Sequence, residues 1–155
     1  MEAYRNILIA LDFAPGADAV LERARDLSER HGARLVLLHV VEYVPPLDLA
    51  YDPVVPMGVD IENQLVERAQ AELEGRVARQ GLAGAEVHVE VGSPKREIVH
   101  FAEQCGADLI VVGTHGRHGL SLLLGSTANG VLHHAPCDVL AVRITEPSSG
   151  AREPG

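Results

Sequence analysis

Short runs of consecutive apolar residues recur along this chain, and they limit the folds open to it more than any other feature. Four runs carry few polar residues: 6–11 (NILIAL), 35–41 (LVLLHVV), 108–112 (DLIVV) and 138–144 (DVLAVRI). Strands that are apolar on both faces need cover on both faces, as in a parallel sheet between two layers of helices. A fifth run, Glu86–Val91 (EVHVEV), alternates polar and apolar residues and is expected nearer a sheet edge.

Helical patterns lie between these runs. Over residues 15–31, apolar residues recur on one helical face, and Gly32 is the expected stop. Pro15 suits the first position of this helix, because proline lacks the N–H that would be unpaired there. A longer helix is expected to begin after a cap at Asp60 and to stop near Gly81. Its expected inward face consists of Ile61, Leu65, Ala69, Leu73 and Val77.

Two further helices are indicated by their capping residues. Ser93 is an N-cap residue followed by a first-turn proline, Pro94. Gly125 and Ser126 open a shorter helix that Pro136 ends. Strands and helices therefore alternate along the chain. This order predicts one α/β domain with a doubly wound parallel sheet and helices on both faces, a Rossmann-like architecture.

A chain of 155 residues suits a single domain, which we expect to span residues 1–145. Residues 43–59 contain four prolines, too many for the interior of a helix or strand. We expect them to form a semi-rigid excursion on the side of the sheet where the strands end. Residues 146–155 (EPSSGAREPG) are polar and rich in helix breakers, and we expect a flexible tail.

The charge balance argues against nucleic-acid and membrane partners. Thirteen Lys and Arg residues stand against 22 Asp and Glu, a net charge of −9, whereas DNA, RNA and anionic lipid require a basic face. Aromatic residues make up 3% of the chain and there is no Trp, so base-stacking platforms are not expected. No stretch reaches the roughly 18 apolar residues of a membrane span. The two cysteines fit no metal or redox motif, and we expect a cytoplasmic protein.

A glycine cluster after the fourth strand is the strongest candidate for a binding site. It reads Gly113-Thr114-His115-Gly116-Arg117-His118-Gly119, and Gly125-Ser126-Thr127 follows after LSLLL. Ligands of open α/β sheets bind beyond the carboxyl ends of the strands, where bare amides and a helix N-terminus favour a phosphate. The spacing matches neither a Walker A loop nor the G-x-G-x-x-G fingerprint. From spacing alone, a phosphate cradle and a structural glycine-rich turn both remain open.

Four stretches resemble the universal stress protein family: ILIALDF, LLHVV, DLIVVGTHGR, and GST followed by HHAPCDVLAVR. The match spans residues 4–144. The resemblance implies a five-stranded sheet of order 3-2-1-4-5, of the adenine nucleotide alpha hydrolase-like type, with a crevice between strands one and four. It also implies a family divided into members that bind ATP and members that do not. The ATP-binding members carry G-x2-G-x9-G-[ST], whereas this chain has only eight residues between Gly116 and Gly125.

Carried over by position, the resemblance assigns Ala10 and Asp12 to the nucleoside end of an ATP site and Val40 to the adenine. Around the ribose and phosphates it places Val112, Gly113, His115, Gly116, Gly125, Ser126 and Thr127. The Asp12 carboxylate would repel phosphates, so it is expected to accept from a ribose hydroxyl or the adenine amino group, or to face Mg²⁺. Arg117 is the cation of the glycine loop, and Mg²⁺ is expected to complete the neutralisation of the phosphates.

Other polar residues carry less information. A metal site is not expected from the histidines and cysteine that lack a fixed ligand geometry, namely His115, His118, His133, His134 and Cys137. His39, inside the second strand, is expected to be a hydrogen-bonded core residue. Charged helix positions such as Glu22, Arg68 and Glu72 are expected to form solvated exteriors.

The first functional hypothesis is therefore a universal stress protein that binds ATP as a small regulatory module of the stress response. No catalytic base or arginine finger is evident in the sequence, so hydrolysis is expected to be slow or absent. One alternative is a nucleotide-free member that acts by dimerisation and protein–protein contact, and another is a weak nucleotide hydrolase. The last strand is apolar at a predicted sheet edge, and the resemblance implies a homodimer through Val139, Ala141 and Val142.

Overall fold

The computed structural model describes residues 3–42, 57–82, 84–114 and 125–144. Within these ranges strands and helices alternate strictly: β1 (Asn6–Ala10), α1 (Ala17–His31), β2 (Arg34–Val41), α2 (Met57–Arg79), β3 (Glu86–Val91), α3 (Pro94–Cys105), β4 (Leu109–Gly113), α4 (Ser126–His134) and β5 (Asp138–Val142). The predicted order of elements is confirmed. Most of the predicted excursion, residues 43–56, and the expected tail lie outside the described residues.

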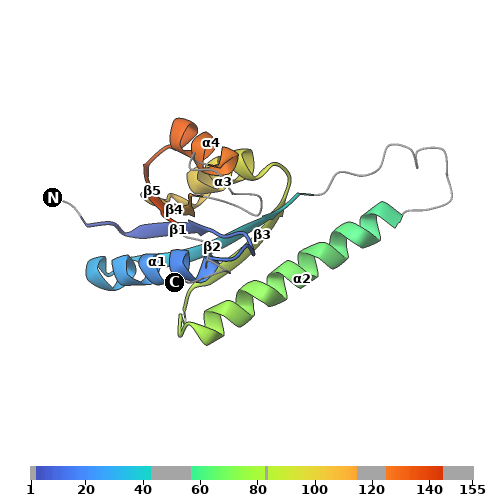
Figure 1. Ribbon diagram of the computed structural model, residues 1–155, viewed down its shortest axis with the longest axis horizontal. Coiled ribbons are helices and arrows are strands. Elements are labelled where there is room, and N and C mark those ends of the chain that lie inside the picture. Colours follow the sequence, from blue (N-terminus) through green and yellow to red (C-terminus); the bar gives the residue numbers. More distant parts are fainter. Residues whose placement is uncertain (1–2, 43–56, 83, 115–124, 145–155) are drawn as a thin grey trace, which may run out of the picture.

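The described strands form one parallel sheet of order β3-β2-β1-β4-β5, as expected. The alternating strand β3 lies at one edge, which confirms its predicted position, and β5 lies at the other. The central strand β1 pairs on both sides, with Ile7 opposite Leu35 of β2 and opposite Leu109 of β4. Figure 1 shows α1 and α2 on one face of this sheet and α3 and α4 on the other. The chain leaves β1 and β4 towards opposite faces, which opens a crevice where these two strands end.

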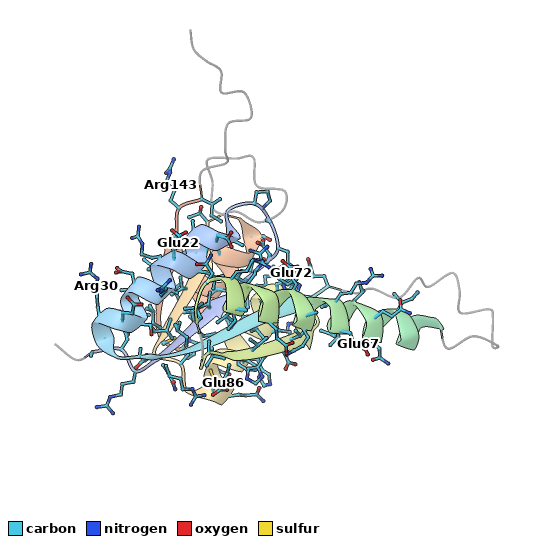
Figure 2. All side chains as sticks on the ribbon, turned by 90° about the horizontal axis from the view of Figure 1, so that it is seen from below. Glu22, Arg30, Glu67, Glu72, Glu86 and Arg143 are labelled. Atoms are coloured by element: carbon cyan, nitrogen blue, oxygen red, sulfur yellow. The ribbon has the colours of Figure 1, made fainter. Side chains whose placement is uncertain are left out.

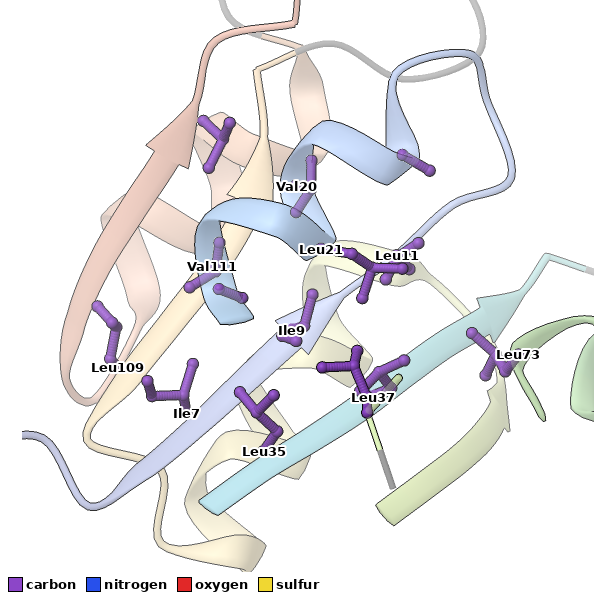
Figure 3. Close-up of a cluster of buried hydrophobic side chains, with 14 of the residues drawn as sticks. Ile7, Ile9, Leu11, Val20, Leu21, Leu35, Leu37, Leu73, Leu109 and Val111 are labelled. Carbon is purple, nitrogen blue, oxygen red and sulfur yellow. The ribbon is translucent and has the colours of Figure 1, made fainter. Parts of the chain in front are cut away.

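Two hydrophobic cores cover the two faces of the sheet, because alternate strand residues point to opposite sides. The first core packs strand residues against α1 and α2, and Figure 3 shows its members Ile7, Ile9, Leu11, Val20, Leu21, Leu35, Leu37, Leu73, Leu109 and Val111. The second packs the intervening residues against α3 and α4: Leu8, Val36, Leu38, Val40, Ile110 and Val112, with Ile98, Phe101, Ala102, Ala128 and Val131. Burial on both faces accounts for the uninterrupted apolar runs.

The start of α1 differs from the prediction. The helix begins at Ala17 after Gly16, so Pro15 lies in the preceding turn and not at the first helical position. The reason is the backbone of Gly16, whose φ of 96° is not helical and favours glycine. The predicted stop is confirmed: Gly32 has φ 67° and ψ 33°, and its N–H donates to the Ser28 carbonyl.

The long helix α2 begins earlier than predicted and does not pack along its whole length. It starts at Met57, so Asp60 lies inside the first turn and is not the N-cap. Ala69 and Leu73 are buried as predicted, but Ile61 is 43% exposed and the prediction that it faces inward is wrong. Figures 1 and 2 show the reason: the first turns of α2 extend beyond the end of the sheet and do not lie against the described strands.

The remaining caps follow the predictions. The Ser93 carbonyl accepts from the N–H groups of Arg96 (3.1 Å) and Glu97 (2.8 Å), with Pro94 at the start of α3. Gly125 precedes α4, which ends before Pro136. Strand β5 ends at Val142, two residues before the predicted limit of 144. Val142 is buried in the core beside α1, so the part of β5 that is only half-buried comprises Val139, Leu140 and Ala141.

Candidate functional site

A cleft of about 1040 Å³ opens where the parallel strands end. Its walls are the last residues of β1, β2 and β4, the first turns of α1, α3 and α4, and one face of α2. Ligand pockets typically measure about 300–1,000 Å³, so the cleft has room for a nucleotide-sized molecule. Its position at the carboxyl ends of β1 and β4 is where open α/β sheets bind ligands.

The structure brings most of the predicted site residues to this one cleft. Eight of them line it: Ala10, Asp12, Val40, Val112, Gly113, Gly125, Ser126 and Thr127. The other three, His115, Gly116 and Arg117, lie outside the described residues. The eight come from β1, β2, β4 and α4 and from the turns that follow or precede them. The parallel sheet is what gathers residues so far apart in the sequence.

The cleft is lined by an apolar wall and by the carboxylate of Asp12. Ala10, Val40 and Val112 all contribute to the face of the sheet that α3 and α4 cover, because they occupy equivalent alternate positions of their strands. Asp12 follows β1 by two residues, and its Oδ1 accepts a hydrogen bond from the Ala14 N–H at 3.2 Å. This short-range bond orients the carboxylate at the strand end. Such a wall suits a planar apolar ring, and such a carboxylate suits hydroxyl or amino donors.

The first turn of α4 also lines the cleft. The first N–H groups of a helix have no acceptor within the helix, and together with the helix dipole they favour an anion. At α4 the N-cap is Gly125, which has no side chain to satisfy these groups, and the first turn carries no acidic residue. The hydroxyl residues Ser126 (exposed) and Thr127 (half-buried) add further donors at the same place.

Thr114 connects the ends of β4, β5 and α4. Its N–H donates to the Val142 carbonyl (2.9 Å), and its carbonyl accepts from the Gly125 N–H (2.8 Å). Its Oγ1 accepts from the Ile144 N–H at 3.1 Å. The position of the α4 N-cap in the cleft is therefore tied to the chain that leaves β5.

Several cleft residues were not predicted, because their side chains reach it from α2 and from the first core. Arg68, Glu72 and Arg76 follow each other at four-residue spacing and line the cleft. Of these, Arg68 and Glu72 were expected on a solvated helix exterior. The four-residue spacing places them on one helical face, and this was the available signal. Nothing local in the sequence shows that this face meets the end of β1. Glu22, by contrast, is exposed on α1 as predicted (Figure 2).

Arg76 is the most enclosed of these charges, with 14% of its side chain exposed. Its Nη1 lies 2.9 Å from Asp18 Oδ1, and its Nε lies 3.0 Å from Glu72 Oε2. The guanidinium also stands over the Phe13 ring, 5.6 Å from the centroid. This cation is therefore neutralised by two carboxylates and held against an aromatic face.

His39 is a hydrogen-bonded core residue, as predicted. It is buried, and its Nδ1 donates to the Leu11 carbonyl at 2.7 Å. The imidazole also stacks on Phe13, with ring centroids 4.1 Å apart and an interplanar angle of 18°. His39 and Phe13 both line the cleft, on the side of the sheet that the first core covers.

The described residues contain no group of three or more His, Cys, Asp or Glu residues arranged to hold a metal ion. Cys105 and Cys137 are both free thiols. Burial raises the pKa of Cys105, and burial together with the nearby Asp138 carboxylate raises the pKa of Cys137 to about 11. Both thiols therefore stay protonated, and unreactive, at neutral pH. No helix in the described ranges is long and apolar enough to cross a membrane.

Comparisons with known proteins agree with this architecture. The model of the universal stress protein family matches residues 3–143. Universal stress protein A homolog 2 of Coxiella burnetii is 45% identical over 145 residues, which are 93% of this chain and 98% of that protein. The solved structure of the hypothetical protein MJ0577 superposes with a TM-score of 0.77 at 28% identity and covers 93% of this chain and 99% of its own. A universal stress protein solved in complex with cAMP shares the fold, with a TM-score of 0.66 at 24% identity over 93% of this chain and 100% of its own.

Proposed function

This chain belongs to the universal stress protein family, and on that premise we propose that it is a small regulatory module that binds ATP with Mg²⁺. The ligand would lie in the cleft at the ends of β1 and β4, and its presence or absence would be the signal. Turnover would be slow or absent. The observation that carries the proposal is that one cleft is lined by an apolar wall, a carboxylate and a helix N-terminus.

The proposed orientation follows from the chemistry of these lining groups. Adenine would lie against Ala10 and Val40, with Asp12 accepting from the ribose or the adenine amino group. The phosphates would lie at the first turn of α4, near Ser126 and Thr127. The reverse orientation would put the phosphates beside the Asp12 carboxylate, which would repel them.

The donors of the cleft also fit Mg²⁺. The Ser126 and Thr127 hydroxyls are hard oxygen ligands of the kind that Mg²⁺ takes beside phosphates. The ion would supply positive charge to the phosphates. This contribution matters because Arg76 already has two carboxylate partners, Asp18 and Glu72. Arg76, held in this way, is not offered to a transferring phosphoryl group.

Isothermal titration with Mg-ATP tests the proposal, together with two variants that add the same charge at different places on α4. Ser126→Glu puts a carboxylate into the first turn at an exposed position, where negative charge favours the helix itself, so folding is preserved. Asn129→Glu adds the charge one turn later, at an exposed position outside the cleft lining. We expect Ser126→Glu to weaken ATP binding at least tenfold and Asn129→Glu to bind within about threefold of the parent, a difference of about 1.4 kcal/mol per factor of ten.

The outcomes separate the functional alternatives. A parent protein that gives no heat with Mg-ATP, and carries no adenine nucleotide after purification, contradicts the proposal and leaves the nucleotide-free module. Equal loss in both variants would show that the α4 N-terminus is not the phosphate end. Sustained phosphate release over many turnovers would favour the hydrolase instead. Titrations with AMP and cAMP beside ATP would show whether a full triphosphate is needed.

The proposal includes a homodimer and a cytoplasmic location. Strand β5 lies at a sheet edge with Val139 and Ala141 half-buried, and an apolar edge strand favours pairing with another copy. Light scattering is expected to give twice 16.6 kDa for the parent and 16.6 kDa for Val139→Lys. A Val139→Lys variant that keeps the dimeric mass would contradict this interface. In the reducing cytoplasm Cys105 and Cys137 would remain free, as they are in the structure.

A further inference from the structure

Ile144 occupies an unusual position for a residue just after an edge strand. It is 8% exposed, belongs to the core beside α1, and lines the cleft. Its side chain lies directly on two glycines from separate turns, Gly16 before α1 and Gly113 at the end of β4. A Cβ added at Gly16 would overlap Ile144 Cγ2, and a Cβ added at Gly113 would overlap Ile144 Cδ1.

The two glycines are required for different reasons. Gly16 has a φ of 96°, so its backbone favours glycine whatever surrounds it. Gly113 is not among the glycines with positive φ, so any residue could adopt its backbone. What excludes a side chain there is the Ile144 side chain, with Val20 Cγ2 also 3.3 Å from the added Cβ. Gly113 begins the G-x2-G sequence, yet in this structure its missing side chain makes room for Ile144 on the α1 face.

We propose that Ile144 is a positioning residue for the ligand cleft: by seating on Gly16 and Gly113 it holds Thr114, and through Thr114 it holds the N-terminus of α4. This inference rests on the proposed nucleotide site. Two hydrogen bonds accepted by Thr114 connect Ile144 to α4. The Ile144 N–H donates to Thr114 Oγ1 (3.1 Å), and the Gly125 N–H donates to the Thr114 carbonyl (2.8 Å). Movement of Ile144 out of its seat displaces the amides that receive the phosphates.

Small displacements matter here because binding groups must lie within about 0.5 Å of their productive positions. A close-packed core does not absorb an added methyl group without shifting its neighbours. At Gly113 the nearest neighbours are Ile144 and Val20. The end of β5 is the freer of the two, since it lies at the sheet edge, whereas Val20 lies within α1. The shift therefore falls on Ile144 and on the Thr114 contacts that it makes.

An exchange of side-chain size between the two positions tests this role. Gly113→Ala adds the methyl that meets Ile144 Cδ1, and Ile144→Val removes that same Cδ1 atom while it keeps Cγ1 and Cγ2. We expect Gly113→Ala to weaken Mg-ATP binding at least tenfold. We expect the double variant, which combines Gly113→Ala with Ile144→Val, to bind Mg-ATP within threefold of Ile144→Val alone. At Gly16 the clash is with Cγ2, which valine retains, so Ile144→Val does not rescue Gly16→Ala.

A control at the opposite end of the same core separates positioning from loss of stability. Ile7 is fully buried in β1, far from the strand ends that line the cleft. Ile7→Val lowers the melting temperature and is expected to leave the affinity for Mg-ATP unchanged in the folded protein. If Gly113→Ala does not fold, Ile144→Ala provides a second test, because it removes the side chain that contacts Gly16 and Gly113 without adding an atom. We expect it to weaken Mg-ATP binding at least threefold.

Each outcome bears on a definite claim. A parent that does not bind nucleotide refutes the proposed function, and this inference with it. If the parent binds Mg-ATP, any of three results overturns the positioning role alone. These are parental affinity in Gly113→Ala, failure of Ile144→Val to restore binding in the Gly113→Ala variant, and parental affinity in Ile144→Ala. Restoration of Mg-ATP binding by Ile144→Val in the Gly113→Ala variant, but not in the Gly16→Ala variant, supports the positioning role. A general loss of stability would not depend on whether the overlapping atom of Ile144 is Cδ1 or Cγ2.

Discussion

Replacing Gly16 by alanine is the most informative single test of how the turn before α1 is built. Two independent features oppose a side chain at this position. The backbone has φ 96° and ψ −6°, a conformation that L-amino acids rarely adopt. The new methyl group would also overlap Cγ2 of Ile144, a side chain that is itself 8% exposed and has little room to move.

The expected loss is the sum of these two effects. A non-glycine residue in the left-handed region costs about 1–2 kcal/mol. Overpacking a well-filled core by one methyl group costs about 1–3 kcal/mol. We therefore expect Gly16→Ala to lower the free energy of unfolding by about 2–5 kcal/mol, against a total of about 5–15 kcal/mol for a domain. For a domain of this size that corresponds to a melting temperature lower by about 4–20 °C.

Gly32 provides a matched control for the conformational part. It also has a positive φ, 67°, but nothing lies within 4 Å of a Cβ added there. Gly32→Ala should therefore cost only the backbone term, about 1–2 kcal/mol. Urea unfolding followed by circular dichroism measures both variants on the same scale. Equal losses at Gly16 and Gly32 would refute the steric role assigned to Ile144, and a smaller loss at Gly16 would refute the turn geometry as well.

Two further predictions concern charge. Arg76→Met keeps the aliphatic stem but removes the ion pairs to Asp18 and Glu72 and the contact with the Phe13 ring; because these carboxylates are partly exposed, we expect about 1 kcal/mol lower stability in urea unfolding. The difference from the parent should shrink in 1 M salt, and an undiminished difference would argue against the ion pairs. Burial, reinforced by Asp138, raises the pKa of Cys137 from 9.0 to about 11, so the folded protein retains this proton where the unfolded chain loses it. Its contribution to stability is complete below pH 9 and is lost as the pH rises to about 11. Melting temperatures between pH 8 and 11 should fall less steeply for Cys137→Ala, and parallel curves would contradict the shift.

Much of the architecture was readable in the sequence, because it depends on residues close together in the chain. The uninterrupted apolar runs indicated strands buried on both faces, and the alternation of β3 indicated an edge strand. Gly32 and Ser93 marked helix ends through backbone rules that act over one turn. The order of the strands was implied by the family resemblance. Eight candidate site residues were placed at one cleft, because residues just after parallel strands meet at the same end of a sheet.

The wrong prediction for Ile61 and the missed cleft residues of α2 share one cause. Ile61 follows a faultless helical pattern, but α2 extends past the sheet and leaves this side chain exposed. Arg68 and Glu72 resembled an ordinary solvated helix face, and only the packing of α2 against β2 and β3 brings this face to the cleft. A periodic pattern defines which side of a helix is apolar. It contains no information about where that helix ends relative to the sheet.

By itself, the sequence determined the kinds of elements, their approximate limits, the family, and the strand ends at which a ligand would meet the sheet. The tertiary structure decided which side chains from distant segments surround that place, including the contact of Ile144 with Gly16 and Gly113. The physical reason is range. Backbone conformation and periodicity are set within a few neighbouring residues, whereas a steric fit between residues far apart in the chain exists only after the sheet has brought them together.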